Sequence, residues 1–226
     1  MIEAFGFMGS IDLENHFFKR DAHWLLNIYD SAETHADNKA KEVELIMTKN
    51  KKFEQSGLLT EEKEKLLEDF VHYKFHFKHL TLHSLFISAY SLLENHLQTI
   101  AKQLELYSID RPKIKEINKY KSELDKIRKY LNIIHDIQTA KCDNTSWQLI
   151  LKFQKIRNLI VHNGSTLNDT SKEICIRFLK KYETNFSQDY TFNISDRNFL
   201  ADFCKVTSAY SDSIVTDIYK IGHFNW

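Results

Sequence analysis

The sequence predicts an all-α protein, and three observations support this fold class. The 226 residues include only 5 glycines and 1 proline, so the residues that β-turns need are scarce. Lys, Glu, Leu and Ile dominate, and apolar residues recur at helical spacing over long stretches. Hydrophobic residues make up 42% of the chain, enough for a sizeable core. We expect a helical bundle with long core helices, as one domain over 1–226, because no repeat, low-complexity tract or flexible linker divides it.

The composition excludes several classes of protein. The 31 basic and 31 acidic residues balance, which argues against a protein that coats DNA through its overall charge but leaves local basic patches open. No apolar run approaches the roughly 18 residues of a membrane span, and no secretory signal begins the chain. The cysteines suit neither a disulfide framework nor a zinc site, which favours a cytoplasmic protein; they are Cys142, Cys175 and Cys204.

The first part of the chain, residues 10–50, is expected to form one long helix or two shorter ones. Its middle, residues 30–42, is much more polar than the segments on either side. A loop over Lys49–Gly57 should follow. The early apolar stripe of this region consists of Leu13, Phe17, Trp24, Leu25 and Tyr29.

The longest helix is expected from Thr60 to about Leu106, with or without a bend. Glu61 and Glu62 lie in its first turn, where negative charge suits the helix dipole. Its second half is densely apolar and should be the central core helix; it reads LTLHSLFISAYSLLENHLQTIAKQL.

Shorter elements follow. A helix should begin with Asp110 as its cap and run to about His135, with Pro112 in its first turn, where proline costs little. After a loop over 139–146 we expect a helix over Trp147–Ser165. The remaining elements are a helix over Ser171–Tyr182, an irregular or briefly extended segment over 186–195, and a last helix over Asp196–Tyr219, capped by Ser195 and burying Phe199, Phe203, Val206 and Tyr210 on one face.

The helix over Trp147–Ser165 carries the functional signal. Gly164 can close it in the left-handed conformation. Its predicted buried face consists of Leu149, Phe153, Ile156 and Ile160, at i, i+4, i+7 and i+11. A polar set therefore occupies the last turn and a half of a helix that is otherwise committed to the core: Arg157, Asn158, His162 and Asn163.

These polar residues are suited to one chemistry. Asn158 and His162 are four apart and share a helix row, so the amide can orient the imidazole. Arg157 is five residues from His162, about 140° round the helix, and reaches the site from the next row. Proton transfer and anion stabilisation are the two needs of phosphodiester cleavage by a ribose 2′-hydroxyl, with no metal or other cofactor. The simpler alternative is a surface arginine beside a histidine that caps the helix.

The motif RNLIVHN, on a late helix of an all-α chain of this size, resembles the HEPN superfamily. Its signature is an Arg, a polar residue that is often Asn, several further residues and a His at the end of a helix; Arg157, Asn158 and His162 match. The helix that holds Glu94 is similar to the earlier core helix of bacterial members, which often carries an acidic residue there. The resemblance covers roughly residues 70–220. It implies a HEPN-like core over about 60–221 with a C-terminal helical extension.

The resemblance implies a function. Members include metal-independent endoribonucleases of toxin–antitoxin and phage-defence systems, typically homodimers whose paired motifs form one composite cleft. His162 and Arg157 would then act on RNA, with Asn158 orienting them and Glu94 and Asn163 in support. An antitoxin, another regulatory protein or a trigger would restrain the activity. Other members only bind, so the alternative is a non-catalytic module for RNA, a nucleotide or a protein.

A histidine stripe is a second candidate site. His72, His76, His79 and His83 lie at i, i+4, i+7 and i+11, one line down a helix. Such pairs can hold Zn²⁺, although no obvious carboxylate or cysteine partner is present. The alternative is a polar stripe along a helix–helix or subunit seam, or a line whose Glu94 end faces His162 across a cleft.

A basic segment, RPKIKEINKYKSELDKIRKY, is a third candidate. Its tyrosines could stack on bases and its basic residues could hold RNA phosphates, with Lys113, Lys119, Lys121 and Arg128 as the expected contacts. The alternative is a solvated helix face.

Overall fold

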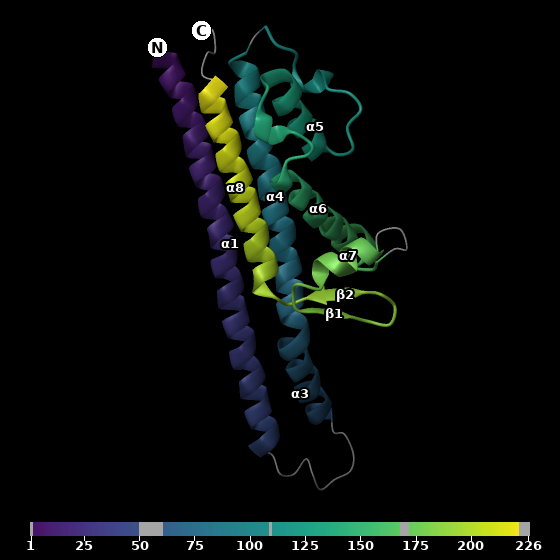
Figure 1. The fold of residues 1–226 in the computed structure, drawn as a ribbon. Helices are drawn as coiled ribbons and strands as arrows, with labels where there is room; N and C mark the ends of the chain where they lie inside the picture. The colour runs from purple at the N-terminus through teal and green to yellow at the C-terminus, as the bar shows by residue number, and fades with distance from the viewer. Residues whose placement is uncertain (1, 50–60, 109, 168–171, 222–226) are drawn as a thin grey trace.

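The computed structural model describes residues 2–49, 61–108, 110–167 and 172–221, and the all-α helical bundle predicted from the sequence is confirmed. Three long helices lie side by side, α1 (Ile2–Lys49), α4 (Phe77–Leu106) and α8 (Arg197–Ile221), and the elements between α4 and α8 in the chain lie mainly on the other side of α4 from α1 (Figure 1). Within the described ranges, every helix is too short or too polar to cross a membrane.

Helix α1 is one continuous helix of 48 residues, longer than any other α-helix described. The predicted stripe on it is mostly wrong, because Leu13, Phe17 and Trp24 are exposed and only Tyr29 is fully buried. The true buried face recurs at steps of four and seven residues, which keeps one side of the helix against α4 and α8. That face consists of Phe7, Ile11, Phe18, Ala22, Tyr29 and Ala36. Beyond Lys49, the predicted loop lies outside the described residues.

The predicted helix over residues 60–106 is interrupted once. Helix α3 (Glu61–Val71) continues into a π-helical segment, His72–His76, and then into α4. Helix α3 has acidic residues in its first turn, as expected, while Thr60 lies outside the described residues. Helix α4 buries the apolar half of the segment and forms the centre of the bundle.

The predicted helix from Asp110 to His135 is wrong in its first half. A 3₁₀ turn, Ile114–Glu116, is followed by irregular chain, and α5 (Glu123–Lys129) begins only after Ser122, whose hydroxyl accepts a hydrogen bond from the Asp125 N–H at 3.2 Å. The residue before a proline is disfavoured in the helical region, and Lys119 has a φ of 58°, so the chain cannot run as one helix here. A π-helical turn, Tyr130–Ile134, and a 3₁₀ turn, Gln138–Ala140, complete the segment.

Helix α6 (Thr145–Asn163) begins slightly earlier than predicted, because the Asn144 side chain caps it by accepting from the Trp147 N–H at 3.1 Å. Helix α7 (Lys172–Leu179) follows. The predicted extended segment is a hairpin of β1 (Thr184–Phe186) and β2 (Phe192–Ile194), antiparallel with Phe186 opposite Phe192.

Helix α8 starts close to its predicted position with a different cap. The Asp196 carboxylate accepts from the Asn198 N–H at 2.8 Å, so Asp196 takes the role predicted for Ser195. The predicted face is confirmed for Phe199, Phe203 and Tyr210, which are buried, while Val206 is half-buried.

Four phenylalanines join α6 to the two helices that hold it in place, α4 and α8. Phe153 of α6 lies 6.1 Å from Phe86 of α4, and 5.3 and 5.2 Å from Phe199 and Phe203 of α8, measured between ring centroids. The rings are tilted or edge to face, an arrangement that adds to the free energy of burying them. Packing of this kind fixes the rotation of α6 against the bundle.

Three buried histidines should make the fold sensitive to acid. Burial is the main cause that lowers the pKa of His83, His96 and His135 to about 4, below the ordinary value of about 6.5. The unfolded chain therefore binds more protons between these values, so stability is full above about pH 6.5 and falls as the pH drops towards 4. We expect a loss of roughly 1–2 kcal/mol per histidine by pH 5, measured by urea unfolding at pH 7 and pH 5. His135→Phe should reduce this loss; an unchanged pH dependence in that variant would contradict the assignment.

Candidate functional site

The predicted site residues lie at the exposed end of α6. Asn158, His162 and Asn163 are exposed, and Arg157 is half-buried. Gly164 ends the helix with a φ of 55°, as predicted. The N–H groups of Gly164 and Ser165 both donate to the Leu159 carbonyl oxygen, so the backbone itself closes the helix. His162 forms no hydrogen bond or ion pair with any described residue, and the imidazole does not act as a cap.

The core face of α6 differs in part from the predicted one. Phe153 and Ile156 are fully buried as expected, but Leu149 and Ile160 only flank the core. The buried row advances in steps of three residues: Trp147, Ile150, Phe153, Ile156 and Leu159. Such a row winds round the helix because different helices cover α6 along its length. The ring of Trp147 lies 6.0 Å from that of Tyr210 in α8, and the ring of Phe153 lies 5.0 Å from that of Phe178 in α7.

Arg157 reaches back towards the bundle centre. Its Cζ lies 5.6 Å from the centroid of the Tyr90 ring, and its Nη1 donates to Asn158 Oδ1 at 3.2 Å. Its Nε is buried and has no hydrogen-bond partner among the described residues. The guanidinium is thus held against α4 by the Tyr90 ring and along α6 by the Asn158 amide, and its charge is not neutralised by an ion pair within the described chain.

Glu94 belongs with Arg157 rather than with His162. It is half-buried one helical turn beyond Tyr90, and burial raises the pKa of its carboxyl group, an effect that the charge of Arg157 opposes and Glu123 reinforces. No hydrogen bond or ion pair in the described parts of the chain joins Glu94 to His162. The predicted contacts from Glu94 and Asn158 to the imidazole are therefore absent there, and both residues lie near the arginine instead.

The hairpin ties the end of α6 to the bundle. The Phe192 N–H donates to the Ser165 carbonyl at 3.0 Å, and the Leu167 N–H donates to the Tyr190 carbonyl at 3.1 Å. At the other end of β2, the Ile194 N–H donates to His83 Nε2 at 3.3 Å. These bonds connect the residues just after His162 to α4 through a short strand.

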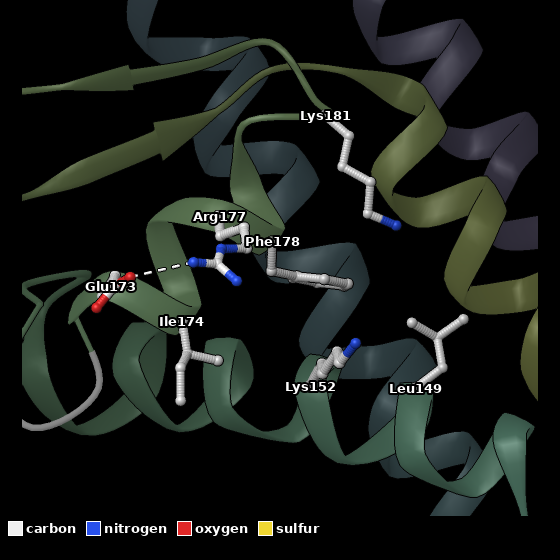
Figure 2. A pocket seen from close by; sticks show the side chains of 7 residues that line it. All are labelled: Leu149, Lys152, Glu173, Ile174, Arg177, Phe178 and Lys181. Carbon is white, nitrogen blue, oxygen red and sulfur yellow. Dashed lines mark hydrogen bonds and ion pairs between the residues drawn. The ribbon is translucent and has the colours of Figure 1, made fainter.

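A cation-lined pocket of about 380 Å³ lies between α6 and α7 (Figure 2). Leu149, Ile174 and Phe178 give it an apolar wall, and Lys152, Arg177 and Lys181 surround them, with Arg177 bonded to Glu173 at 3.1 Å.

Helix α6 also carries an exposed polar row, mostly basic, that the sequence did not lead us to predict. Lys152, Lys155, Asn158 and His162 are all exposed and follow one another at three or four residues along α6. The signal was available in the sequence, because these polar positions fall between those of the buried row.

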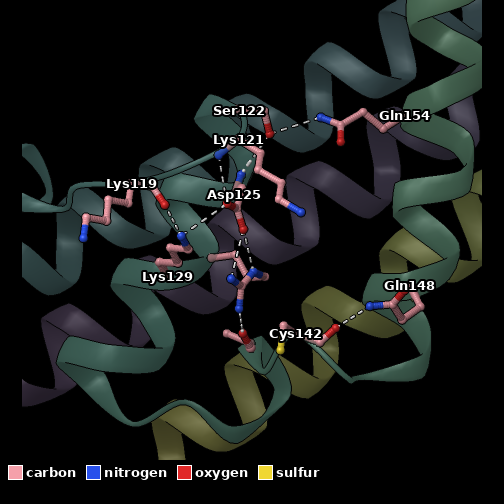
Figure 3. Close-up of polar contacts among 10 residues, drawn as sticks. Lys119, Lys121, Ser122, Asp125, Lys129, Cys142, Gln148 and Gln154 are labelled. Atoms are coloured by element: carbon pink, nitrogen blue, oxygen red, sulfur yellow. Dashed lines mark hydrogen bonds and ion pairs between the residues drawn. The ribbon is translucent and has the colours of Figure 1, made fainter.

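The basic segment is only partly available to a ligand. Arg128 is buried and donates twice to Asp125 Oδ1, at 3.1 and 2.9 Å, and once to the Ala140 carbonyl at 2.9 Å, so its predicted RNA contact is wrong. Asp125 also accepts from the Lys121 N–H at 3.0 Å (Figure 3). The Asp125 carboxylate therefore connects the side chain of Arg128 to the backbone N–H of Lys121 and holds this segment in its folded form. The side chains of the other predicted contacts, Lys113, Lys119 and Lys121, are exposed.

The two later histidines of the predicted stripe are part of the packed fold, and the two earlier ones are on the surface. His72 and His76 are exposed in the π-helical segment, whereas His79 and His83 are buried. His79 Nδ1 lies 2.9 Å from the Phe75 carbonyl oxygen, and His83 Nε2 accepts from β2 as above. Within the described ranges, no group of three or more His, Cys, Asp or Glu residues is placed to hold a metal ion.

Comparison of the chain with known protein families, with curated proteins and with solved structures finds no match. Arg157, Asn158 and His162 are therefore interpreted from their own geometry. That geometry combines an exposed imidazole that no described residue engages with a guanidinium held one helix row away.

The helix end that carries His162 depends on the backbone of Gly164. Because its φ is 55°, Gly164→Ala should lower the free energy of unfolding by about 1 kcal/mol. Gly9→Ala is the matched control, since Gly9 lies in α1 without a positive φ and with open space around it; this change should raise stability by about 0.5–1 kcal/mol. Urea unfolding measures both. Equal effects of the same sign would contradict the role given to Gly164.

Proposed function

We propose that this protein is a metal-independent endoribonuclease of a defence or toxin–antitoxin type, as its resemblance to the HEPN superfamily implies. His162 would remove the proton from a ribose 2′-hydroxyl, which attacks the adjacent phosphorus. The bond from phosphorus to the 5′-oxygen breaks, leaving a 2′,3′-cyclic phosphate and, after protonation by an imidazolium, a 5′-hydroxyl. Arg157 would stabilise the negative charge that builds up on the phosphate oxygens.

The observation that carries this proposal is that no described residue bonds the His162 imidazole. A capping histidine would bond the last carbonyls of its helix, but here the backbone N–H groups of Gly164 and Ser165 bond the Leu159 carbonyl. The imidazole is exposed, and the neighbouring Arg157 has no ion-pair partner in the described chain. Both groups remain available for a substrate.

The position of the site supports a homodimer. His162 does not line the pocket between α6 and α7 and is exposed, so one copy presents it on open surface. Val161 beside it is 42% exposed, which offers an apolar contact at the same spot. Two α6 ends that face each other would enclose the paired motifs in one composite cleft and exclude water, which strengthens the electrostatic interactions within it.

The charge around α6 favours a polyanionic substrate. Lys152 and Lys155 lie in the exposed row that leads to His162, and the pocket between α6 and α7 adds Arg177 and Lys181. These positive charges suit the RNA backbone, which binds to proteins largely through its phosphates.

The same pocket favours the second candidate, a non-catalytic module that binds RNA, a nucleotide or a protein. Its apolar wall and surrounding cations suit a ligand with a flat apolar part and a negative charge. Expression distinguishes the two functions, since an unrestrained ribonuclease should slow the growth of its host and a binding module should not. An antitoxin, another regulatory protein or a trigger is part of the first proposal alone, and a cytoplasmic location suits both.

Cleavage of RNA tests the proposal directly. Purified protein should cut total RNA and tRNA in EDTA, and His162→Ala should reduce the rate by a factor of at least 100, because general acid–base catalysis contributes about 10²–10⁴-fold. Products are assayed for 2′,3′-cyclic phosphate ends.

The control is His76→Ala, which removes another exposed histidine and should leave the rate unchanged. RNA left intact by the wild type, with no growth defect on expression, would favour the binding module. Equal cleavage by the wild type and by His162→Ala would show that His162 is not the catalytic residue.

Glu94 should matter through Arg157. Glu94→Ala is expected to slow RNA cleavage about tenfold, because the half-buried carboxyl group helps to orient the guanidinium, while thermal unfolding shows an intact fold. Glu123→Ala is the matched control, since this exposed carboxylate influences Glu94 only through its charge. A rate unchanged by Glu94→Ala would remove Glu94 from the site.

A further inference from the structure

Helix α1 carries an apolar stripe on its solvent side that the bundle does not use. Leu13, Phe17, Trp24 and Ile28 are 53%, 38%, 60% and 47% exposed. Their spacing of i, i+4, i+11 and i+15 places them in one line, about a third of a turn round the helix from its buried face and about 22 Å long. Large apolar side chains that gather in one exposed patch mark a contact surface more often than scattered ones do.

The stripe is symmetric about its own midpoint. Leu13 and Ile28 lie equally far from the point between Arg20 and Asp21, and so do Phe17 and Trp24. If two copies of α1 pair antiparallel across a two-fold axis at that point, Leu13 meets Ile28 of the second copy and Phe17 meets its Trp24. A two-fold interface requires a surface that is complementary to itself in this way.

The charges at the midpoint fit the same arrangement. Arg20 Nε and Nη2 donate to Asp21 Oδ1 at 2.9 and 2.7 Å, and the Arg20 Cζ lies 4.8 Å from the centroid of the Phe17 ring. Antiparallel pairing sets each Arg20 opposite an Asp21 of the second copy, so the four charges alternate. Parallel pairing in register would set like charges opposite each other, which is unfavourable.

We propose that this stripe of α1 forms an antiparallel interface with the same stripe of a second copy of the chain. Helix α1 lies on the far side of α4 from α6 (Figure 1), so its exposed stripe is separate from the contact suggested at His162 and does not depend on the ribonuclease function. A second copy is the occupant because both the apolar pairs and the charges match under a two-fold rotation.

The mass in solution tests the interface. Light scattering at micromolar concentration should show that Trp24→Glu halves the mass of the wild-type particle, while thermal unfolding stays the same because Trp24 is 60% exposed. Ile133→Glu is the matched control, since Ile133 is 66% exposed outside the stripe, and it should leave the mass unchanged. His162→Ala should also leave this contact intact. A loss of RNA cleavage without a change in mass would therefore concern the catalytic proposal alone, and a failure of the interface would show only in the mass. An unchanged mass for Trp24→Glu, as expected if the stripe binds a lipid surface or another protein, would overturn the inference.

A charge swap tests the antiparallel register. R20D carries two acidic residues at the midpoint and D21R carries two basic ones, so each variant alone should self-associate about tenfold more weakly than the wild type. An equimolar mixture should recover the affinity, because the unlike charges of the two variants then face each other. A mixture that associates no more tightly than the separate variants would rule out this pairing.

Discussion

The contact between Phe153 and Phe86 sets the geometry on which the rest of the candidate site depends. Four residues further along each helix, Arg157 lies over the ring of Tyr90, so the aromatic contact between α6 and α4 is followed one turn later by a cation–aromatic contact. The rings of Phe199 and Phe203 contact both Phe153 and Phe86 and hold the pair against α8. The position of the guanidinium is therefore a consequence of core packing, while the imidazole five residues later extends beyond the core.

The end of α6 combines rigidity with access. Backbone bonds close the helix at Gly164 and tie the following residues to β2, and β2 is bonded in turn to His83 of α4. None of these bonds uses the side chain of His162. A site built in this way has a fixed position while its reactive group stays free for a ligand, which is what preorganised chemistry requires.

The spacing of residues in the sequence predicted well which side chains share one face of a helix. It predicted less well which of those faces packs against the core. The class of fold, the left-handed Gly164 and the buried Phe153 follow from local patterns. The buried face of α1 does not, because two apolar stripes compete there and only packing against α4 and α8 decides between them. Arg128 looked like its basic neighbours, yet Asp125 and the distant Ala140 carbonyl bring it into the core. Contacts between distant segments cannot be derived from spacing within one helix.

The π-helical segment at His72–His76 controls the rotational phase between α3 and α4. Its bonds span five residues rather than four, so it accommodates one residue more than an α-helical turn does. A chain of the same length that ran as unbroken α-helix at this point would turn α3 by about 100° relative to α4. The π-helical form of this segment thus decides which side of α3 meets α1. For the evolution of this bundle, the segment is equivalent to a single-codon insertion that leaves the helix surfaces on either side of it in place, so deleting one residue there should be tolerated.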